Sequence, residues 1–492
     1  MSFTSAHESH AGHAAHHGHG ESGHMSDPHM QHMYMQHLQR LWVHFAVIAL
    51  GVWLLASPWM LGYLEPGSFG PDVGRVTAER GLAPPEARAQ AMMWSDIAAG
   101  CLLMVFGAMS LFWRHRWAQW GTCFTGIWLL FAPLVFWAPD AASTNNDLLI
   151  GALAITFSIL VPMMPGMSME AMQAEEDIPP GWSYSPSSWS QRLPIIGLAL
   201  FSFFLARHLT AYQLGHISAV WDPFFGDGTA RIITSDVSKA WPVADAGLGA
   251  VSYLLEALSG IMGDRRRWRT MPWMVGMFGV LVIPLGAVSI FFIIIQPIMI
   301  GTWCTLCLVT AAAMVLMLPY SFDEIVAMFQ FLTRARREGK SVWQVFWHGG
   351  TIDGAGRDAS PPLEPGRHHL TQLKEQARSL PMGLTVSAAI GVWLMFTRAT
   401  LGTEGTLANS DHLVGSLVFT FSIAAFAEVA RPLRAINMLF GAWLVVAPWL
   451  LAGGSLYATV ADMIAGAVLI ALAIPRGPVR KHYAGWDRYL VW

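Results

Sequence analysis

A succession of long apolar segments constrains this chain more than any other feature. Twelve of its segments are apolar for about the 20 residues that a membrane-spanning helix needs. Charged residues make up 12% of the chain, against about 25% in a soluble protein. We therefore predict an all-α polytopic membrane protein with about 12 transmembrane helices. The expected spans are 40–63, 92–113, 118–137, 147–165, 193–213, 243–262, 271–296, 301–320, 382–401, 411–430, 436–452 and 461–475.

Polar segments divide the spans into three groups of four. The expected regions are a His/Met-rich tail at 1–37, helical groups at 38–165, 193–320 and 381–476, linkers at 166–192 and 321–380, and a C-terminal tail at 477–492. In the second linker we expect short helices around Phe322–Arg337 and His369–Ser379. Neither a long basic stripe nor a soluble domain is present to bind nucleic acid.

Basic residues near the span ends all favour one orientation. Arg114, Arg265–Arg269, Arg334–Lys340, Arg431 and Arg476–Lys481 fall on one side of the predicted membrane. Because such residues collect in cytoplasmic loops, we predict a protein of the cell inner membrane with both termini cytoplasmic. No signal-peptide pattern opens the sequence, so we expect insertion through the first helix. Lipid is then an obligatory partner.

The first 37 residues contain ten histidines and several methionines. Their polar, Gly- and Ser-rich composition predicts a disordered tail. Imidazole and thioether groups also bind copper, nickel or zinc loosely. No fixed ligand spacing is present, so no dedicated metal site is predicted.

The stretch Trp303-Cys304-Thr305-Leu306-Cys307 holds two of only four cysteines. It lies where one apolar span gives way to the next, at the start of a predicted helix. Two thiols at this spacing can form a disulfide and reopen, and the helix N-terminus lowers the pKa of the nearer cysteine. The predicted orientation places the pair at the outer face, in an oxidising compartment. The alternative is a pair of cysteines with no redox role.

A two-helix unit is repeated four times, twice before and twice after the middle group. Its first helix carries Gly-x-Trp followed by proline, and its second carries Asp-x-x-x-Gly. A small residue lets neighbouring membrane helices approach closely. The aspartate is interpreted as an N-cap, the alternative being a row of intramembrane carboxylates. The copies contain Gly51, Pro58, Asp96 and Gly100; Gly126, Pro133, Asp147 and Gly151; Gly391, Arg398, Asp411 and Gly415; and Gly441, Pro448, Asp462 and Gly466.

These copies resemble the SPW-repeat family of membrane proteins, named for a Ser-Pro-Trp signature. The signature is complete at Ser57-Pro58-Trp59, close at Ala447-Pro448-Trp449, weaker at Ala132-Pro133-Leu134 and lost at Thr397-Arg398-Ala399. The resemblance implies no defined activity.

The middle group resembles the vitamin K epoxide reductase family. The likeness depends on four helices, on Cys304 and Cys307 at the start of the fourth, and on a stretch before the second helix that contains Ser238, Pro242, Gly247, Gly249 and Tyr253. It implies an oxidoreductase that couples thiols to ubiquinone or menaquinone, with a periplasmic thioredoxin-like protein as thiol donor. In that case Cys307 would face the quinone, Cys304 would exchange disulfides, and Ser238 would lie near the ring.

The chain departs from this family in its outer loop. The family's shuttle cysteines are missing, because Gly215–Trp241 contains no cysteine and Cys101 and Cys123 fall within spans. Either a partner reaches Cys304 directly, or the thiol relay has been lost. The aromatic residues Trp221, Phe224 and Phe225, with Trp303, are candidates for binding the quinone. Alternatively, the loop aromatics anchor the loop at the membrane surface.

Three functions follow from these features. The preferred one is a membrane thiol/quinone oxidoreductase with repeat units on either side. The second is a non-catalytic relative that binds quinone or a partner without turnover. The third is a metal-handling membrane protein that uses the His/Met-rich tail.

Overall fold

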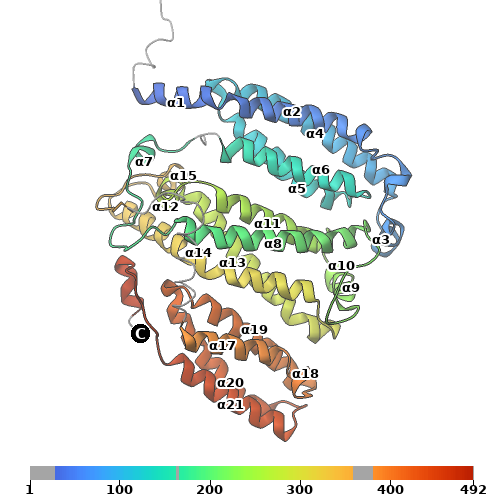
Figure 1. Ribbon diagram of the computed structural model, residues 1–492, viewed down its shortest axis with the longest axis vertical. Helices are drawn as coiled ribbons and strands as arrows, with labels where there is room; N and C mark the ends of the chain where they lie inside the picture. Colours follow the sequence, from blue (N-terminus) through green and yellow to red (C-terminus); the bar gives the residue numbers. More distant parts are fainter. Residues whose placement is uncertain (1–27, 162–165, 358–380, 491–492) are drawn as a thin grey trace, which may run out of the picture.

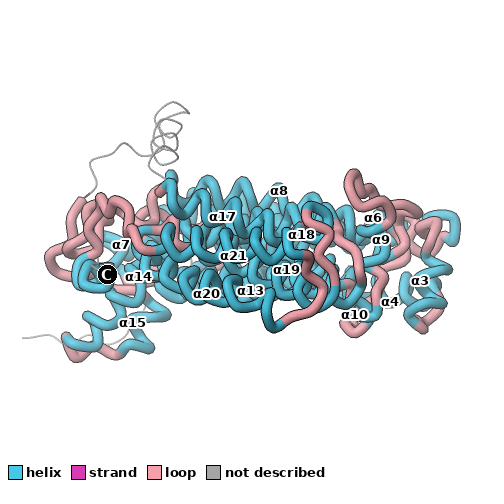
Figure 2. The backbone as a smooth tube through the Cα atoms, turned by 90° about the horizontal axis from the view of Figure 1, so that it is seen from below, coloured by secondary structure: helices cyan, strands magenta, loops and turns pink. Residues whose placement is uncertain are grey.

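A computed structural model describes residues 28–161, 166–357 and 381–490. Within these residues the chain is helical, and its only strand-like pairings are isolated bridges. Three groups of helices lie side by side, and the axes of their long helices are roughly aligned (Figure 1). A view turned by 90° shows the loops gathered at the two ends of the helices (Figure 2). This arrangement confirms the predicted all-α polytopic membrane protein.

Each group contains four long helices. The N-terminal group consists of α2 (Leu41–Met60), α4 (Pro85–Ser110), α5 (Ala118–Val135) and α6 (Ala141–Ile155). The central group consists of α8 (Trp189–Leu214), α11 (Asp245–Ile261), α13 (Pro272–Ile295) and α14 (Thr305–Arg337). The C-terminal group consists of α17 (Met382–Met395), α19 (Gly405–Ala424), α20 (Ile436–Leu450) and α21 (Leu456–Ala473).

Short helices occupy the two ends of the molecule. One end carries α7 (Met169–Gln173), α12 (Arg267–Thr270), α15 (Val342–His348) and the C terminus, and the other carries α3 (Val73–Arg80), α9 (Gly228–Ile233), α10 (Asp236–Lys239) and α18 (Thr397–Thr400) (Figure 1). The arginines of α12 therefore lie at the opposite end from α9 and α10.

Eight helices among the described residues are long and apolar enough to cross a membrane. They are α2, α4, α5, α8, α13 with its extension, α14, α20 with the turn before it, and α21. The four other long helices, α6, α11, α17 and α19, coincide with the remaining predicted spans but are shorter or less apolar. The count of twelve spans stays a prediction.

The glycines of the repeat confirm the predicted close approach of the two helices in each copy. A Cβ atom on Gly126 would lie 2.8 Å from the carbonyl oxygen of Gly151, and one on Gly151 would lie 2.7 Å from that of Gly126. Such contacts leave no space for a side chain. The same reciprocal contact joins Gly51 to Gly100, Gly391 to Gly415 and Gly441 to Gly466.

A Gly126→Ala substitution is therefore expected to destabilise the protein by roughly 1–3 kcal/mol, as overpacking does. Gly197 in α8 provides a matched control, because a Cβ atom there would meet nothing within 4 Å. Gly197→Ala should be neutral or stabilising by up to about 1 kcal/mol, since alanine is the better helix former. Thermal unfolding in detergent measures both variants, and equal melting temperatures would contradict the packing argument.

The interpretation of the repeat aspartates as N-caps was wrong. Asp96, Asp147, Asp411 and Asp462 are fully buried in the interior of α4, α6, α19 and α21. Other residues cap two of these helices: Asp140 accepts the backbone N–H of Ser143 (2.6 Å), and Ser455 accepts that of Ala458 (3.1 Å). The predicted spans began too late, because α4 already starts at Pro85.

Two other boundaries also differ from the prediction. The helix expected around Phe322–Arg337 is present, but it continues the span before it without a break, as α14. The polar residues of this part have buried partners: Glu324 forms an ion pair with Arg267, and Asp323 accepts the hydroxyl of Tyr184. The end of the expected tail is helical, as α1 (Pro28–Gln39), and His37 is buried 3.2 Å from the carbonyl oxygen of Leu111. The helix expected at 369–379 lies outside the described residues.

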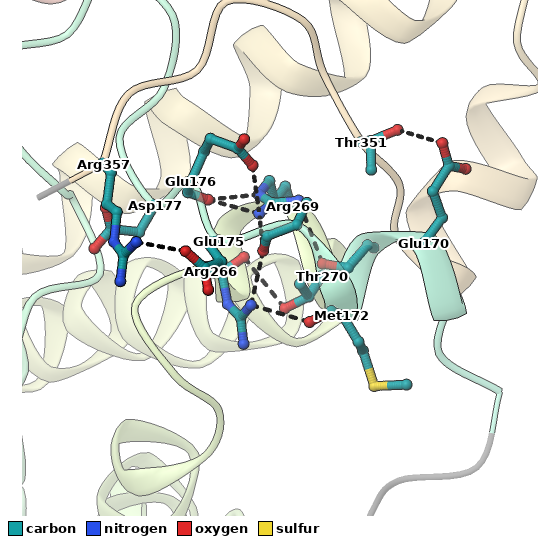
Figure 3. A network of polar contacts seen from close by, with 12 residues as sticks. Glu170, Met172, Glu175, Glu176, Asp177, Arg266, Arg269, Thr270, Thr351 and Arg357 are labelled. Carbon is teal, nitrogen blue, oxygen red and sulfur yellow. Dashed lines mark hydrogen bonds and ion pairs between the residues drawn. The ribbon is translucent and has the colours of Figure 1, made fainter. Parts of the chain in front are cut away.

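The linkers pack against each other at the α12 end of the molecule (Figure 3). Arg266 donates to the carbonyl oxygens of Met172 (3.0 Å) and Ala174 (2.7 Å), and Arg269 donates to that of Glu176 (2.6 Å). Arg357, from the second linker, forms an ion pair with Glu175 of the first. These contacts form a polar cap over the end of the central group.

Candidate functional site

The cysteine pair lies where the sequence places it, at the start of α14. Cys304 and Cys307 are joined by a disulfide, and their Cα atoms are 5.2 Å apart. Cys304 is the N-cap of α14, and its sulfur accepts the backbone N–H of Cys307 (3.1 Å). The backbone N–H of Cys304 in turn donates to the side-chain oxygen of Gln296 (3.0 Å), in the short π-helix η4 (Gln296–Ile300). The backbone of the pair is therefore fixed from both sides.

The two sulfurs have different surroundings. Cys304 is fully buried in an apolar cluster with Leu209, Ile232, Ile233 and Leu306. Cys307 is half-buried and lines a cavity among the four helices of the central group. Only Cys307 is therefore open to a molecule in that cavity, whereas a second reactant at Cys304 must first displace the residues that cover it.

The cavity beside Cys307 is largely apolar with one polar corner. Leu209, Ile232, Phe292 and Ile293 contribute apolar surface, and Ser238, Asp245, Tyr253 and Thr310 contribute polar groups. Ser238 and Cys307 thus line the same cavity, as the family resemblance implies for residues near a quinone ring.

Ser238 is the centre of a buried hydrogen-bond network. Its hydroxyl accepts from the side-chain nitrogen of Gln213 (3.0 Å) and lies 2.9 Å from both the carbonyl oxygen of Ile233 and a carboxylate oxygen of Asp245. A hydroxyl has one proton to donate, so it serves one of these two acceptors at a time. The network fixes the serine and keeps a polar group at the wall of an apolar cavity.

Arg80 reaches this network from the N-terminal group. Its guanidinium donates to the hydroxyl and to the carbonyl oxygen of Ser238 (3.3 Å each), and it lies 4.9 Å above the ring of Trp137. Sequence reasoning missed Arg80, because it lies in a charged loop far along the chain from the central group. No sequence signal would have identified it.

Asp222 fastens the outer loop to the start of α14. Its carboxylate accepts the hydroxyls of Thr305 (2.5 Å) and Thr229 (2.6 Å). It also accepts the backbone N–H groups of Phe224 (3.1 Å) and Phe225 (2.9 Å). Burial alone would raise the pKa of Asp222, but these hydrogen bonds outweigh burial and lower that pKa. Sequence reasoning quoted this loop for its aromatic residues and overlooked the aspartate.

The four predicted quinone-binding aromatics lie away from the cavity. Trp221 and Phe224 are 65% and 78% exposed, which fits the alternative that they anchor the loop at the membrane surface. The ring of Phe225 lies 5.3 Å from that of Trp303, and Trp303 lies 5.6 Å from Phe396 of the C-terminal group. None of the four lines the cavity beside Cys307. The structure therefore brings Ser238, but not these aromatics, to Cys307.

The part of the chain that the structure describes contains no group of three or more His, Cys, Asp or Glu residues placed to hold a metal ion. Most histidines of the tail precede residue 28 and lie outside the described residues.

The arrangement is a disulfide whose two sulfurs have different neighbours. A disulfide of this kind opens when a thiolate attacks one of its sulfurs, and it re-forms when an oxidant removes two electrons. The cavity reaches Cys307, and the loop that Asp222 joins to α14 packs against Cys304 through Ile232 and Ile233.

Comparisons with known proteins agree with this geometry. A search of curated proteins and a search of solved structures found no match. Residues 193–322 match the model of the Vitamin K epoxide reductase family, and residues 82–161 and 383–475 match the SPW repeat domain. The matched residues include the cysteine pair, Ser238, the whole of α11 and α13, most of α8 and the first half of α14. The chain is therefore a multi-pass membrane protein with a vitamin K epoxide reductase family domain between two SPW repeat domains.

Proposed function

We propose that this protein is a membrane thiol/quinone oxidoreductase. The observation that carries the proposal is the bonded pair Cys304–Cys307, with Cys307 on the wall of an apolar cavity that also contains Ser238. Its position within a vitamin K epoxide reductase family domain supports the same chemistry.

The residues of the cavity fit a quinone. Leu209, Ile232 and Phe292 provide apolar surface for the ring, and Ser238 and Tyr253 provide hydroxyls for its polar oxygens. When bound, ubiquinone or menaquinone would take up the two electrons and two protons that a dithiol releases as it becomes a disulfide. Cys307 presents its sulfur to the cavity, and Asp245 and Gln213 hold the Ser238 hydroxyl in place.

The thiol donor in this proposal is a periplasmic thioredoxin-like protein that reaches Cys304 itself. The loop 215–241 has no cysteine to relay the electrons. Because Cys304 is fully buried, the loop must open for the donor to attack it. One donor thiolate would then bond to Cys304 and release Cys307, which takes up a proton. The second donor thiol would attack the donor sulfur of this mixed disulfide, so that the donor disulfide forms and Cys304 is released as a thiol.

The proposed location is the cell inner membrane, with both termini cytoplasmic. The arginines of α12 and the C terminus lie at one end of the helices, and α9 and α10 of the outer loop lie at the other. The positive-inside rule assigns the arginine end to the cytoplasm.

The proposal is tested by trapping the thiols of the wild-type protein in lipid nanodiscs. The protein is reduced, freed of reductant without oxygen, and mixed with a short-chain ubiquinone or a menaquinone analogue. The protein is then denatured, a maleimide labels the remaining thiols, and mass spectrometry locates the label. We expect Cys304 and Cys307 to become oxidised only when quinone is present, while Cys101 and Cys123, which lie in the N-terminal group, stay labelled as internal controls.

Two results would contradict the proposal. A redox state of the pair that does not respond to quinone would exclude the oxidoreductase. Quinone binding without oxidation of the pair would instead support the non-catalytic alternative.

A further inference from the structure

The third copy of the repeat differs from the other three where its signature is lost. In the other copies the first helix runs two residues past its proline, whereas α17 ends at Met395, before Arg398. The corresponding pairs of proline and last residue are Pro58 and Met60, Pro133 and Val135, and Pro448 and Leu450. The residue after the repeat aspartate is also unusual, because His412 replaces an apolar side chain. Its counterparts are Ile97, Leu148 and Met463.

His412 lies between two backbone carbonyls at helix breaks. Its Nδ1 atom is 3.0 Å from the oxygen of Met395, the last residue of α17. Its Nε2 atom is 2.9 Å from the oxygen of Ile293 in α13. That second carbonyl lacks its ordinary helical partner, because the residue four positions later is Pro297, which has no N–H. His412 is 1% exposed, so no solvent replaces these contacts.

Arg398 also contacts the central group, close to the contact that His412 makes. It occupies the position of the repeat proline, and its guanidinium donates to the carbonyl oxygen of Pro297 (3.4 Å) and to the side-chain oxygen of Asn409. Both substituted residues of the third copy therefore contact the segment around Pro297.

This segment leads directly to the cysteines. Gln296, one residue before Pro297, is buried, and its side-chain oxygen accepts the backbone N–H of Cys304 (3.0 Å). Trp303, the residue immediately before Cys304, packs its ring against Phe396 (5.6 Å) and His412 (6.3 Å). The third copy thus contacts the chain at two places before the redox pair, around Pro297 and at Trp303.

We propose that the third repeat copy is a positioning element for the redox pair, acting through His412 and Arg398. Neither side chain lines the cavity beside Cys307, so both act through η4 and Trp303. This structural role does not rest on the proposed function; only an effect on the rate of turnover rests on it.

Loss of these contacts would loosen the segment that holds Cys304. A disulfide forms readily when its two thiols are held at bonding distance, so a looser segment favours the dithiol. We expect His412→Leu and Arg398→Met each to lower the equilibrium constant for disulfide formation roughly 2- to 30-fold, the usual range for residues that couple neighbouring sites. His412→Gln keeps one donor and should fall between His412→Leu and the wild type.

The experiment equilibrates the full-length variants in nanodiscs with glutathione buffers and counts trapped thiols at Cys304 and Cys307. The matched control is Met463→Leu, which changes the corresponding position of the fourth copy, on α21. A melting temperature for each variant separates a change of redox equilibrium from general unfolding. Where His412→Leu fails to fold, Arg398→Met and His412→Gln provide the test.

A shift in the three variants, with Met463→Leu at the wild-type value, would support the proposal. Equal constants in all variants would overturn it. The glutathione equilibrium requires no quinone, so the result is independent of whether the wild-type pair responds to quinone.

Discussion

A Cys307→Ser variant is expected to lose quinone reduction by at least about 10³-fold, as enzymes do when a reacting side chain is removed. Cys307 is the only cysteine that lines the cavity, and serine cannot form a disulfide with Cys304. The assay supplies a thiol donor and a short-chain quinone, and the absorbance of the quinone measures the rate at which it is reduced. Cys304→Ser should abolish turnover equally, because either change leaves one sulfur without its partner.

The two variants should differ in what the remaining thiol can react with. In Cys304→Ser, Cys307 faces the cavity and should react with a small apolar thiol reagent. In Cys307→Ser, Cys304 lies buried under the outer loop and should react slowly with the same reagent. Cys123→Ser is the control, because Cys123 lies buried in α5 of the N-terminal group. Quinone reduction that survives Cys307→Ser would exclude the assigned role of that residue.

Local features of the sequence were enough to place the cysteine pair and the close contacts of the repeats. Cys304 and Cys307 mark a helix start because two apolar spans meet there, and α14 begins at Thr305. The repeat glycines predicted close helix pairs, and Gly126 and Gly151 contact each other as expected. Both features depend on neighbours in the chain or on a repeated pattern, which a single sequence displays.

The remaining parts of the site depend on contacts between distant segments. Arg80 meets Ser238, and His412 meets Ile293, only because separate helical groups pack together. Hydropathy also divided α14 into a span at 301–320 and a separate helix at 322–337. The helix is continuous there, and Glu324 is paired with Arg267 from another loop. A single sequence contains no pattern that identifies such contacts between distant residues.

Removal of the Asp222 carboxylate is expected to expose Cys304. Asp222→Ala deletes the acceptor for the hydroxyls of Thr305 and Thr229 and for four backbone N–H groups, so the loop should open more often. Hydrogen bonds to a charged group stabilise a protein enough that we expect the disulfide to be reduced roughly 10- to 100-fold faster by dithiothreitol. Asp227→Ala is the matched control, because Asp227 lies exposed in the same loop and its side chain makes no cap hydrogen bond.

The effect of pH follows from the lowered pKa of Asp222. A carboxyl group whose pKa is lower in the folded state stabilises that state above its unfolded pKa, and this stability is lost only as pH falls through the folded pKa. For Asp222 the folded pKa lies below the usual range, because hydroxyl and backbone N–H groups donate hydrogen bonds to its carboxylate. Between about pH 5 and pH 8 the carboxylate therefore stays ionised. The ratio of reduction rates for Asp222→Ala and the wild type should be constant over this window, even though each rate rises with the thiolate fraction of the reductant.

The rate ratio also tests whether the loop controls access to the redox pair at all. If Asp222→Ala and Asp227→Ala are reduced at the same rate, the loop does not limit attack on Cys304, and the donor must reach the disulfide by another route. If the ratio falls as the pH is lowered from about 8 to 5, a group other than Asp222 holds the loop closed. A constant ratio well above one would show that an ionised Asp222 keeps the loop over Cys304, and that a thiol donor must displace this contact before electrons can pass to Cys307.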